Sequence, residues 1–282
     1  MEKLNKFICG IVTFFPDEKV IAKVNKYSDV FDEVLIFDNT PQKISIFEKF
    51  KQNGNVRVFA NGKNEGLSIA YNCFIKSAEK MNGDFLCTMD QDSEFPRGNI
   101  KSMMDYINTH NLNNIAIVGP KVVYDTKSKV DLQSNVIIDR KYLISSGSFL
   151  NLLLLRKKQL TFDPHYFIDR VDVDFCQTCI KNGYRIVEYL GAVLYQTLGI
   201  PTKYVVKGNH SYKRHYYMFR NRFYYNNKFS NNTFQKVSLN IIQSLKQCLR
   251  IIFLEDQRVK KINQLFLAVY DYRHNIMGPG RY

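Results

Sequence analysis

The stretch Phe85-Leu86-Cys87-Thr88-Met89-Asp90-Gln91-Asp92-Ser93 decides the fold that we expect for this chain. Its first five residues are mostly apolar, and a continuous apolar run is typical of a strand that is covered on both faces of its sheet. Two carboxylates, Asp90 and Asp92, follow at the end of that strand. In an open α/β sheet, ligands bind beyond the carboxyl ends of the strands. The stretch therefore predicts a buried strand that leads into an acidic, ligand-facing loop.

The pair Asp90 and Asp92 is itself a candidate metal site. Two carboxylates this close repel each other unless a cation lies between them. A hard divalent ion, bound by one or two carboxylates and by the diphosphate of a substrate, fits such a pair. The alternative is a solvated turn between strand and loop, and the Asp-x-Asp triplet alone does not separate the two interpretations.

Apolar strands and amphipathic helices alternate along the first 120 residues. The expected strands are residues 7–15, 33–37, 55–60, 85–89 and 115–118. The expected helices are residues 17–27, a helix that ends near residue 51, 68–81 and 97–110. The residues expected on the inner faces of two of these helices are Val20, Ile21 and Val24, then Ile69, Cys73, Phe74 and Ala78. This alternation predicts a doubly wound, mainly parallel α/β sheet.

Polar residues follow three of the expected strands, at Asp38, at Asn64 and at Asp90. Because the carboxyl ends of parallel strands meet at one edge, we expect these side chains to converge. An acidic residue at such a strand end accepts hydrogen bonds from a base or ribose in nucleotide folds, although Asp38 before Thr-Pro is equally typical of a turn. Gly66 allows close backbone approach. No G-x-G-x-x-G and no P-loop motif occurs, which disfavours a dinucleotide oxidoreductase and a P-loop NTPase.

Two later segments also carry candidate site residues. Gly147, in a Ser-rich loop, either brings backbone donors to a ligand or forms a simple turn. A helix is expected from about residue 172 to 181. Asp172 and Asp174 lie two apart on it, so they do not face the same side, and only one should point into a cleft. Asp172 alternatively caps the helix.

Composition predicts a globular, cytoplasmic protein. The chain has 282 residues, of which 45% are hydrophobic, enough for a full core. It starts without the apolar segment of a signal peptide and contains no run of roughly 18 apolar residues. Its six cysteines fit a reducing compartment. Cys176 and Cys179 form a single C-x-x-C pair, whereas a zinc site would need two further ligands.

Charge is concentrated at the C-terminal end. Residues 203–282 hold 15 basic and 3 acidic residues, which predicts an anionic partner for this region. An amphipathic pattern there presents Ile241, Ile242, Leu245, Leu249 and Ile252. Such a pattern is typical of a helix packed on its own domain, and the alternative is a helix lying on an anionic membrane leaflet. No recognised nucleic-acid-binding motif accompanies the charge, so a nucleic-acid partner is not expected.

Several short motifs occur together in one order. They are Ile11-Val12-Thr13-Phe14, Phe37-Asp38-Asn39-Thr40, Asn64-Glu65-Gly66, Met89-Asp90-Gln91-Asp92-Ser93, Ser146-Gly147-Ser148, Val171-Asp172-Val173-Asp174, Leu198-Gly199 and Tyr216-Tyr217 with Arg220-Asn221. With this ordered set the chain resembles glycosyltransferase family 2, the inverting transferases of GT-A fold, and especially its rhamnosyltransferase-like branch.

The resemblance implies a role for each matching residue. Thr13, Asp38 and Asn64 would line the nucleotide pocket, with Gly66 and Gly147 contributing backbone contacts to the nucleotide sugar. Asp90 and Asp92 would hold Mn²⁺ or Mg²⁺ on the donor diphosphate. Gln196 stands where the family often has a metal-binding His, and it would be a further metal ligand. Asp172 would be the catalytic base. Arg220 would lie near the phosphates or the acceptor.

The resemblance also implies a domain division and a reaction. Residues 1–211 would form the catalytic domain, with a nucleotide-binding half at 1–120 and an acceptor-binding half at 121–211. Residues 212–282 would form a basic helical region.

The expected reaction is metal-dependent, inverting transfer of a sugar to a lipid-linked saccharide in cell-surface polysaccharide synthesis. Rhamnose from dTDP-rhamnose is expected from the branch; UDP-galactofuranose, UDP-glucose and UDP-galactose stay open. The basic region would hold the enzyme on the inner face of the cell membrane, and a homodimer is left open. A weakly active or inactive subunit that binds a partner transferase is the second interpretation.

Overall fold

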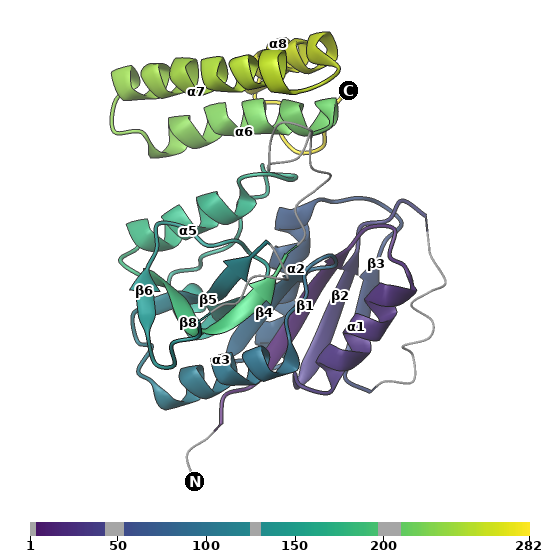
Figure 1. Ribbon diagram of the computed structural model, residues 1–282, viewed down its shortest axis with the longest axis vertical. Helices are drawn as coiled ribbons and strands as arrows, with labels where there is room; N and C mark the ends of the chain where they lie inside the picture. The colour runs from purple at the N-terminus through teal and green to yellow at the C-terminus, as the bar shows by residue number, and fades with distance from the viewer. Residues whose placement is uncertain (1–3, 43–53, 125–130, 197–209) are drawn as a thin grey trace. The chain divides into compact units, whose positions relative to one another are not determined.

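The computed structural model describes residues 4–42, 54–124, 131–196 and 210–282, and the chain divides into two compact units (Figure 1). The sheet unit comprises Met1–Asp163 and Asp172–Thr197, and the helical unit comprises Pro164–Val171 and Leu198–Tyr282. The expected C-terminal region, residues 212–282, thus lies within the helical unit, which also takes in the short segment before Asp172.

The sheet unit is built on one mixed sheet of eight strands. They are β1 (Phe7–Thr13), β2 (Glu33–Asp38), β3 (Val56–Ala60), β4 (Phe85–Asp90), β5 (Ile115–Val123), β6 (Ile137–Asp139), β7 (Ser148–Asn151) and β8 (Arg185–Tyr195). Their order is β3-β2-β1-β4-β7-β5-β8-β6. Strands β1 to β4 pair in parallel, whereas β7 runs antiparallel to both β4 and β5. The doubly wound α/β fold is confirmed, and β1, β2 and β4 are buried strands with continuous apolar runs.

Helices cover the sheet. They are α1 (Glu18–Ser28), α2 (Leu67–Lys80), α3 (Arg97–Thr109), α4 (Leu152–Lys157) and α5 (Val171–Lys181). Asp17 caps α1, and the predicted inner face of that helix is buried. The predicted face of α2 is wrong in part: Ile69 is 37% exposed, while Tyr71 and Ile75 are buried. The buried face of α2 therefore includes Tyr71 in place of Ile69. The ring of Tyr71 packs against Phe162, and its hydroxyl donates to Asp90.

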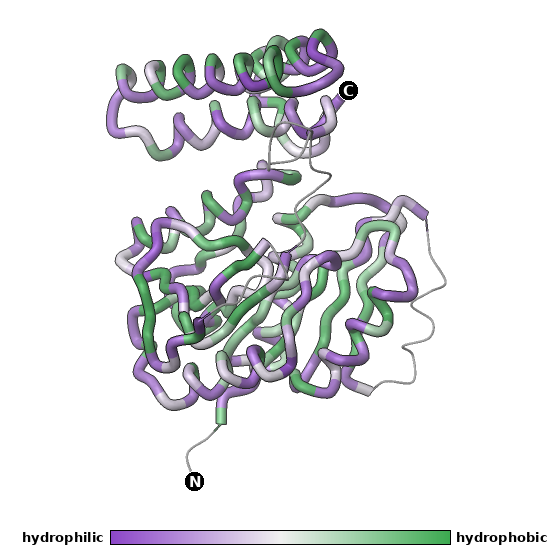
Figure 2. Tube along the Cα trace, in the orientation of Figure 1, coloured by the Kyte–Doolittle hydropathy of each residue, from purple (hydrophilic) through white to green (hydrophobic). Residues whose placement is uncertain are grey.

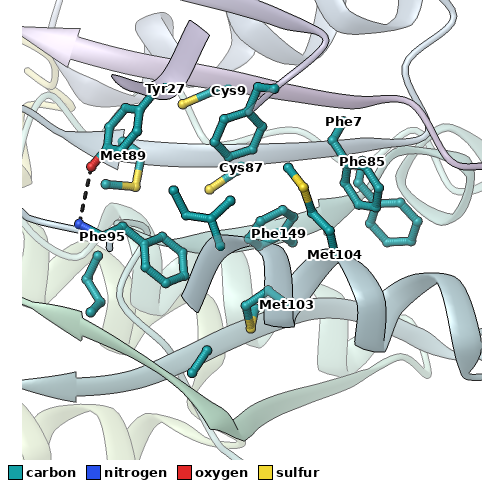
Figure 3. Packing of buried hydrophobic residues seen from close by; sticks show 14 of the residues in the cluster. Phe7, Cys9, Tyr27, Phe85, Cys87, Met89, Phe95, Met103, Met104 and Phe149 are labelled. Atoms are coloured by element: carbon teal, nitrogen blue, oxygen red, sulfur yellow. Dashed lines mark hydrogen bonds between the residues drawn. The ribbon is translucent and has the colours of Figure 1, made fainter. Parts of the chain in front are cut away.

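A mixed aromatic and sulfur-rich core fixes the central strands (Figure 3). Phe7 of β1 stacks on Phe85 of β4, and its ring meets Phe149 of β7 edge-on at 6.0 Å between centroids. Cys9 and Cys87 are buried in the same cluster as free thiols, as expected for small core residues. Each buried ring removes a large apolar area from water, so this packing stabilises the central strands whose ends carry the candidate site.

Three elements were not specified by the sequence pattern. The apolar run that begins at Phe149 divides into β7 and α4, and β8 was not predicted. Strand β5 continues through Gly119 and Pro120 to Val123. The helix predicted to end near residue 51 lies outside the described residues.

The helical unit contains α6 (Tyr212–Phe229), α7 (Thr233–Leu254) and α8 (Arg258–Arg273). Helix α6 packs against both α7 and α8. The buried apolar cluster formed by these three helices consists of Tyr216, Tyr217, Phe219, Phe223, Ile251 and Ala268. Figure 2 shows hydrophobic and hydrophilic residues alternating along all three helices. Only Ile251 of α7 belongs to that core, so most of the apolar side chains of α7 lie elsewhere.

Candidate functional site

The register of the parallel strands brings the predicted strand-end residues to one edge. Thr13 at the end of β1 pairs with Asp38 at the end of β2. Val12 pairs with Asp90 at the end of β4. Since β1 lies between β2 and β4, the side chains of Thr13, Asp38 and Asp90 end at the same level of the sheet, where ligands bind in such folds.

Asp38 is held in place by hydroxyl and backbone donors. Its Oδ1 accepts hydrogen bonds from Thr13 Oγ1 at 3.1 Å, from Thr40 Oγ1 at 2.7 Å and from Thr40 N at 3.1 Å. Asn39 bonds to the next loop, accepting from Glu65 N at 2.9 Å and donating to Gly66 O at 3.3 Å. The loops after β2 and β3 are therefore tied together at this edge.

Asn64 and Gly66 form the turn that starts α2. Asn64 Oδ1 accepts from Gly66 N at 3.0 Å, and Gly66 has a φ of +82°, which a side chain would strain. Both lie at the predicted edge. The side chain of Asn64 is hydrogen-bonded within its own loop, so its contribution to a nucleotide pocket stays a prediction.

Asp90 lies in an electrostatically unfavourable position. Burial, followed by the charge of Asp92, raises the pKa of Asp90 to about 7; the hydrogen bond that Tyr71 donates to its Oδ1 at 3.3 Å opposes this, and the charge of Asp172 adds to it. Asp92 is exposed in the turn after β4. Three carboxylates thus act on one another, and a bound cation would relieve their repulsion.

Gln196 lies beside the Asp-x-Asp loop. Glu94, two residues after Asp92, pairs with Tyr195, with Glu94 N donating to Tyr195 O at 2.8 Å and Tyr195 N to Glu94 O at 2.9 Å. Within the described residues, no three His, Cys, Asp or Glu side chains are grouped as a metal site. The chain would therefore offer two carboxylates and one amide oxygen, a donor set that fits a hard cation whose other ligands are phosphate and water.

The loop before β7 is bonded to the end of β4. Asp90 N donates to Ser146 Oγ at 3.1 Å, and Ser146 Oγ donates to Ser93 Oγ at 2.8 Å. Gly147 N donates to Thr88 O at 2.7 Å. The N–H of Gly147 is therefore used within the sheet unit, and a contact from another part of this loop to a ligand stays a prediction. Its φ of +79° makes it a turn residue.

Asp172 is the second residue of α5, so it is not the helix cap. It is half-buried, and its Oδ1 accepts from Val173 N at 2.8 Å. It lines a pocket with Ser145, Phe162 and Cys176, while Asp174 is 1% exposed. Which of the two carboxylates faces the ligand cleft stays a prediction, and it favours Asp172 because Asp172 is the less buried of the two. Thr88 also lines this pocket and its Oγ1 donates to Ser145 O at 2.6 Å, while Asp90 N donates to Ser146 Oγ, so the pocket that Asp172 lines adjoins the end of β4.

A tight turn precedes α5. Asp169 and Arg170 have φ values of +68° and +60°, in the left-handed region that side chains seldom adopt. Asn221 of α6 holds this turn: its Nδ2 donates to Ile168 O at 2.7 Å and to Asp169 O at 3.0 Å. All of these atoms belong to the helical unit.

The structure does not support the predicted role of Arg220. Its side chain is fully buried within the helical unit. Its guanidinium donates to Tyr216 Oη at 2.8 Å and to the carbonyl oxygens of Ile276 and Gly278 at 3.4 and 2.6 Å. With these donors used by the protein, Arg220 stabilises the helical unit, and its predicted role near the phosphates or the acceptor is corrected to that of a packing residue.

Sequence reasoning missed three residues that shape the site. Tyr71 donates to Asp90, and Ser146 bridges Asp90 and Ser93. Lys23 of α1 donates to Gln91 O at 2.5 Å and to Ser93 O at 2.6 Å, which pins the Asp-x-Asp turn. The helical phase of α2 could have indicated Tyr71, and the motif Ser146-Gly147-Ser148 marked the position of Ser146 but not its contacts; no sequence signal marks Lys23.

Comparison with known proteins identifies the family. The profile described as Glycosyl transferase family 2 matches residues 18–174. A dTDP-rhamnosyl transferase RfbF of Shigella flexneri is 24% identical and covers 96% of this chain and 97% of its own length. The structure of S. aureus TarS 1–349 with UDP-GlcNAc covers 96% of this chain and 82% of its own, at a TM-score of 0.60 and 16% identity. GalNAc-T7 with UDP, GalNAc and Mn²⁺ covers 70% of this chain and 44% of its own, at a TM-score of 0.53 and 14% identity. The mixed sheet, the acidic strand ends and the match over more than half of the chain together establish that it belongs to glycosyltransferase family 2, as a transferase of GT-A fold.

Proposed function

We propose that this protein transfers a sugar from a nucleotide-diphospho donor to a hydroxyl of a lipid-linked saccharide, with inversion and with the help of a divalent metal. The observation that carries the proposal is geometric: Asp172 lines a pocket with Thr88 and Ser145, and the same loop bonds to the backbone of Asp90 through Ser146. The proposal assigns the diphosphate and the metal to Asp90 and Asp92, and the proton of the acceptor to Asp172. Asp90 lies at the carboxyl end of the sheet, where ligands bind in such folds.

Within the proposed site, each residue has one task. Asp172 accepts the proton of the acceptor hydroxyl as its oxygen forms a bond to the anomeric carbon and the bond from that carbon to the diphosphate oxygen breaks. Attack from the face opposite the leaving group gives inversion. Thr13 and Asp38 shape the nucleotide side, with Asn64 and Gly66 beside them. Asp90, Asp92 and Gln196 would hold Mn²⁺ or Mg²⁺, which neutralises charge on the departing diphosphate.

Two comparisons bear on the donor. The Shigella flexneri relative is named a dTDP-rhamnosyl transferase and covers nearly the whole chain, which favours dTDP-rhamnose. The TarS structure holds UDP-GlcNAc, so a UDP-sugar such as UDP-galactofuranose, UDP-glucose or UDP-galactose is the second candidate. The GalNAc-T7 structure contains UDP and Mn²⁺, which supports the proposed cofactor.

The basic C-terminal region supports a membrane-associated location. With 15 basic and 3 acidic residues over 203–282, it is suited to the anionic inner face of a cell membrane, where a lipid-linked acceptor for polysaccharide synthesis would lie. A cytoplasmic enzyme peripheral to that face follows from the proposal. A homodimer remains a prediction.

The proposal is tested by Asp172→Asn, with Asp105→Asn as the matched control on the exposed face of α3. Loss of a positioned base should lower turnover with a nucleotide-sugar donor by about 10²–10⁴-fold. Nucleotide affinity should change much less than turnover, because in the proposal Asp172 contacts the acceptor and not the diphosphate. Turnover near that of the control would remove Asp172 as the base.

A second arm of that experiment separates an enzyme from a partner-binding subunit. A nucleoside diphosphate is titrated calorimetrically with and without Mn²⁺, on the wild-type chain and on Asp92→Asn. A transferase of the proposed kind gains affinity with the metal, and Asp92→Asn loses that gain. A chain that binds nucleotide equally with and without metal, and that turns over no donor, would instead favour the inactive-subunit interpretation.

A further inference from the structure

Helix α7 is polar on the side that faces the protein. Asn226 Nδ2 of α6 donates to Asn240 Oδ1 at 2.7 Å and to Gln243 Oε1 at 3.3 Å. Gln247 is 6% exposed, and its Nε2 donates to His215 Nδ1 at 2.8 Å. The contact between α6 and α7 is therefore made largely through amide hydrogen bonds.

The opposite side of α7 is apolar and faces outward. The large apolar side chains of α7 that are 42–82% exposed are Phe234, Val237, Ile241, Ile242, Leu245, Leu249, Ile252 and Phe253. At 3.6 residues per turn they cover a continuous arc of roughly 160° around the helix. Ser238, which lies within that arc, donates from its Oγ to Phe234 O at 2.6 Å, so its hydroxyl needs no water. Figure 2 shows this helix as strongly mixed in hydropathy.

This arrangement reverses the usual polarity of a soluble helix. Helices of soluble proteins bury their apolar stripe and expose their polar residues. Here Ile241, Leu245 and Leu249, for which the sequence pattern left open both packing on the domain and a membrane leaflet, are 52–58% exposed. A contiguous apolar face of this size marks an interaction surface. Polar contacts between helices with an apolar exterior are typical of a lipid environment.

Charge indicates which apolar surface covers this face. Of the three acidic residues beyond 203, Glu255 and Asp271 are buried in ion pairs with Lys261 and Arg281. Asp256 is the remaining exposed acid. The exposed basic residues described in this unit are Lys213, Arg214, Lys228, Lys246, Arg258, Lys260, Arg273 and Arg281. The helical unit is therefore positively charged overall, which attracts it to an anionic lipid surface, whereas a second copy of the chain would bring two positively charged units together.

The hydrogen bonds to α6 determine how α7 meets the lipid. With 22 residues and moderate hydropathy, α7 is long enough to cross a membrane, and 11% of its most apolar stretch is buried. Yet it is bonded to α6 from Asn240 to Gln247, and α6 exposes Lys213, Arg214 and Lys228. A membrane-crossing α7 would bring these charges into the hydrocarbon, at a cost of several kcal/mol.

We propose that α7 lies in the plane of an anionic bilayer surface, with the arc from Phe234 to Phe253 inserted at the acyl boundary and with α6 held on its water-facing side. Lys246 borders the arc, where its ammonium group reaches lipid phosphates while its stem lies along the apolar surface. The membrane binding itself does not depend on the proposed function. Only its purpose does, which is to bring the site to a lipid-linked acceptor.

The experiment measures co-flotation of the full chain with vesicles, without donor or acceptor. One set of vesicles is phosphatidylcholine alone, and the other contains phosphatidylglycerol as well. The wild type should float with the anionic vesicles and lose part of that binding at high salt. Leu245→Ser/Leu249→Ser should lower the partition coefficient at least about tenfold, because binding scales with buried apolar area. Lys246→Glu should weaken binding to the anionic set alone.

The matched control is Leu132→Ser/Leu153→Ser, which removes two exposed leucines of the sheet unit (44% and 59% exposed) and should bind like the wild type. Equal flotation of the two double variants would overturn the proposal, as would a wild type that does not float. So would a dimer in sedimentation equilibrium that Leu245→Ser/Leu249→Ser dissociates, since a second copy would then cover the face. None of these outcomes depends on Asp172, so a failure here is distinct from a failure of the proposed reaction.

Discussion

At the scale of single residues, Lys23 connects a surface helix to the site. Its Nζ donates to the carbonyl oxygens of Gln91 and Ser93, which lie on either side of Asp92. Hydrogen bonds from a charged donor are stronger than neutral ones. The two bonds hold the backbone of the Asp-x-Asp turn, and they keep the Asp92 carboxylate near Asp90.

Lys23→Met should loosen this turn. We expect loss of the two charged hydrogen bonds to lower Mn²⁺-dependent nucleotide affinity by about tenfold, with a stability cost of about 1–3 kcal/mol. Calorimetric titration of a nucleoside diphosphate with Mn²⁺ measures the first effect. Lys26→Met, on an exposed position of the same helix, is the control. Equal affinities for the two variants would show that the turn holds its shape without Lys23.

The contacts of single residues show which parts of the site the sequence alone could predict and which it could not. Thr13, Asp38 and Asp90 were predictable because each ends an apolar run, and parallel strands end at one edge. Lys23 was not, because its partners lie 68 and 70 positions away and the contact depends on how α1 packs. Arg220 was placed wrongly because a motif fixes the residue type but not the direction in which the side chain points.

At the scale of elements, the loop before β7 depends on Gly147. Its φ is +79°, and a Cβ there would meet Pro120 Cγ at 3.0 Å and Leu194 Cδ1 at 3.2 Å. Both the backbone conformation and the packing therefore exclude a side chain. Because the loop is bonded to β4 beside Asp90, a shift of this turn reaches the site.

Gly147→Ala should destabilise the sheet unit by about 1–3 kcal/mol, through the left-handed conformation and the close contacts. Gly98→Ala is the matched control, since a Cβ at Gly98 meets nothing within 4 Å and the residue lies in α3. That variant should be neutral or slightly stabilising. Urea unfolding of both compares them directly, and a Gly147→Ala chain as stable as the control would contradict the expectation.

The predictability of whole elements follows from what surrounds them. Strands β1, β2 and β4 have continuous apolar runs, and the sequence placed them to within two residues. Strand β8 was missed because Glu188 and Gly191 interrupt its apolar pattern. For α7 the helical period was predictable, but periodicity does not reveal whether an apolar stripe meets a protein core or another apolar phase.

At the scale of the whole molecule, the helical unit contains a buried ionic network. His215 Nε2 and Lys261 Nζ each contact Glu255 Oε2, at 2.8 and 2.9 Å, and all three side chains are at most 1% exposed. Arg250 Nε lies 2.9 Å from Glu255 Oε1. Burial lowers the pKa of His215, against the hydrogen bond to Glu255. Burial opposes ionisation of Glu255, but hydrogen bonds from Lys261 and His215 outweigh it and lower its pKa.

These shifts predict that the helical unit loses stability in acid. The unfolded chain takes up a proton on His215 below about pH 6.5, where the folded chain does not, so falling pH favours unfolding. His210, whose pKa burial and Arg214 lower to about 4, acts in the same direction. The contribution of Glu255 is present above its unfolded pKa and is lost as pH falls through its lower folded pKa. Thermal unfolding followed by far-ultraviolet circular dichroism should give a midpoint that falls between about pH 7 and pH 5.

His215→Gln serves as the control for this acid effect. It removes a group that titrates while keeping a polar side chain next to Gln247 and Glu255. We expect lower stability at neutral pH and a weaker dependence on pH. A wild-type midpoint that stays constant over this range would contradict the argument.

The turn at residues 168–170 affects how far the protein can be truncated from its C-terminus. Asn221 holds the carbonyl groups of Ile168 and Asp169, and the proposed base follows three positions later in the chain. A protein ending after residue 211 would keep every predicted donor-side residue except Arg220, yet it would lose this clamp. Such a minimal fragment would be expected to retain nucleotide recognition and to be a poor catalyst, so excision of the C-terminal helices is not a neutral trimming step.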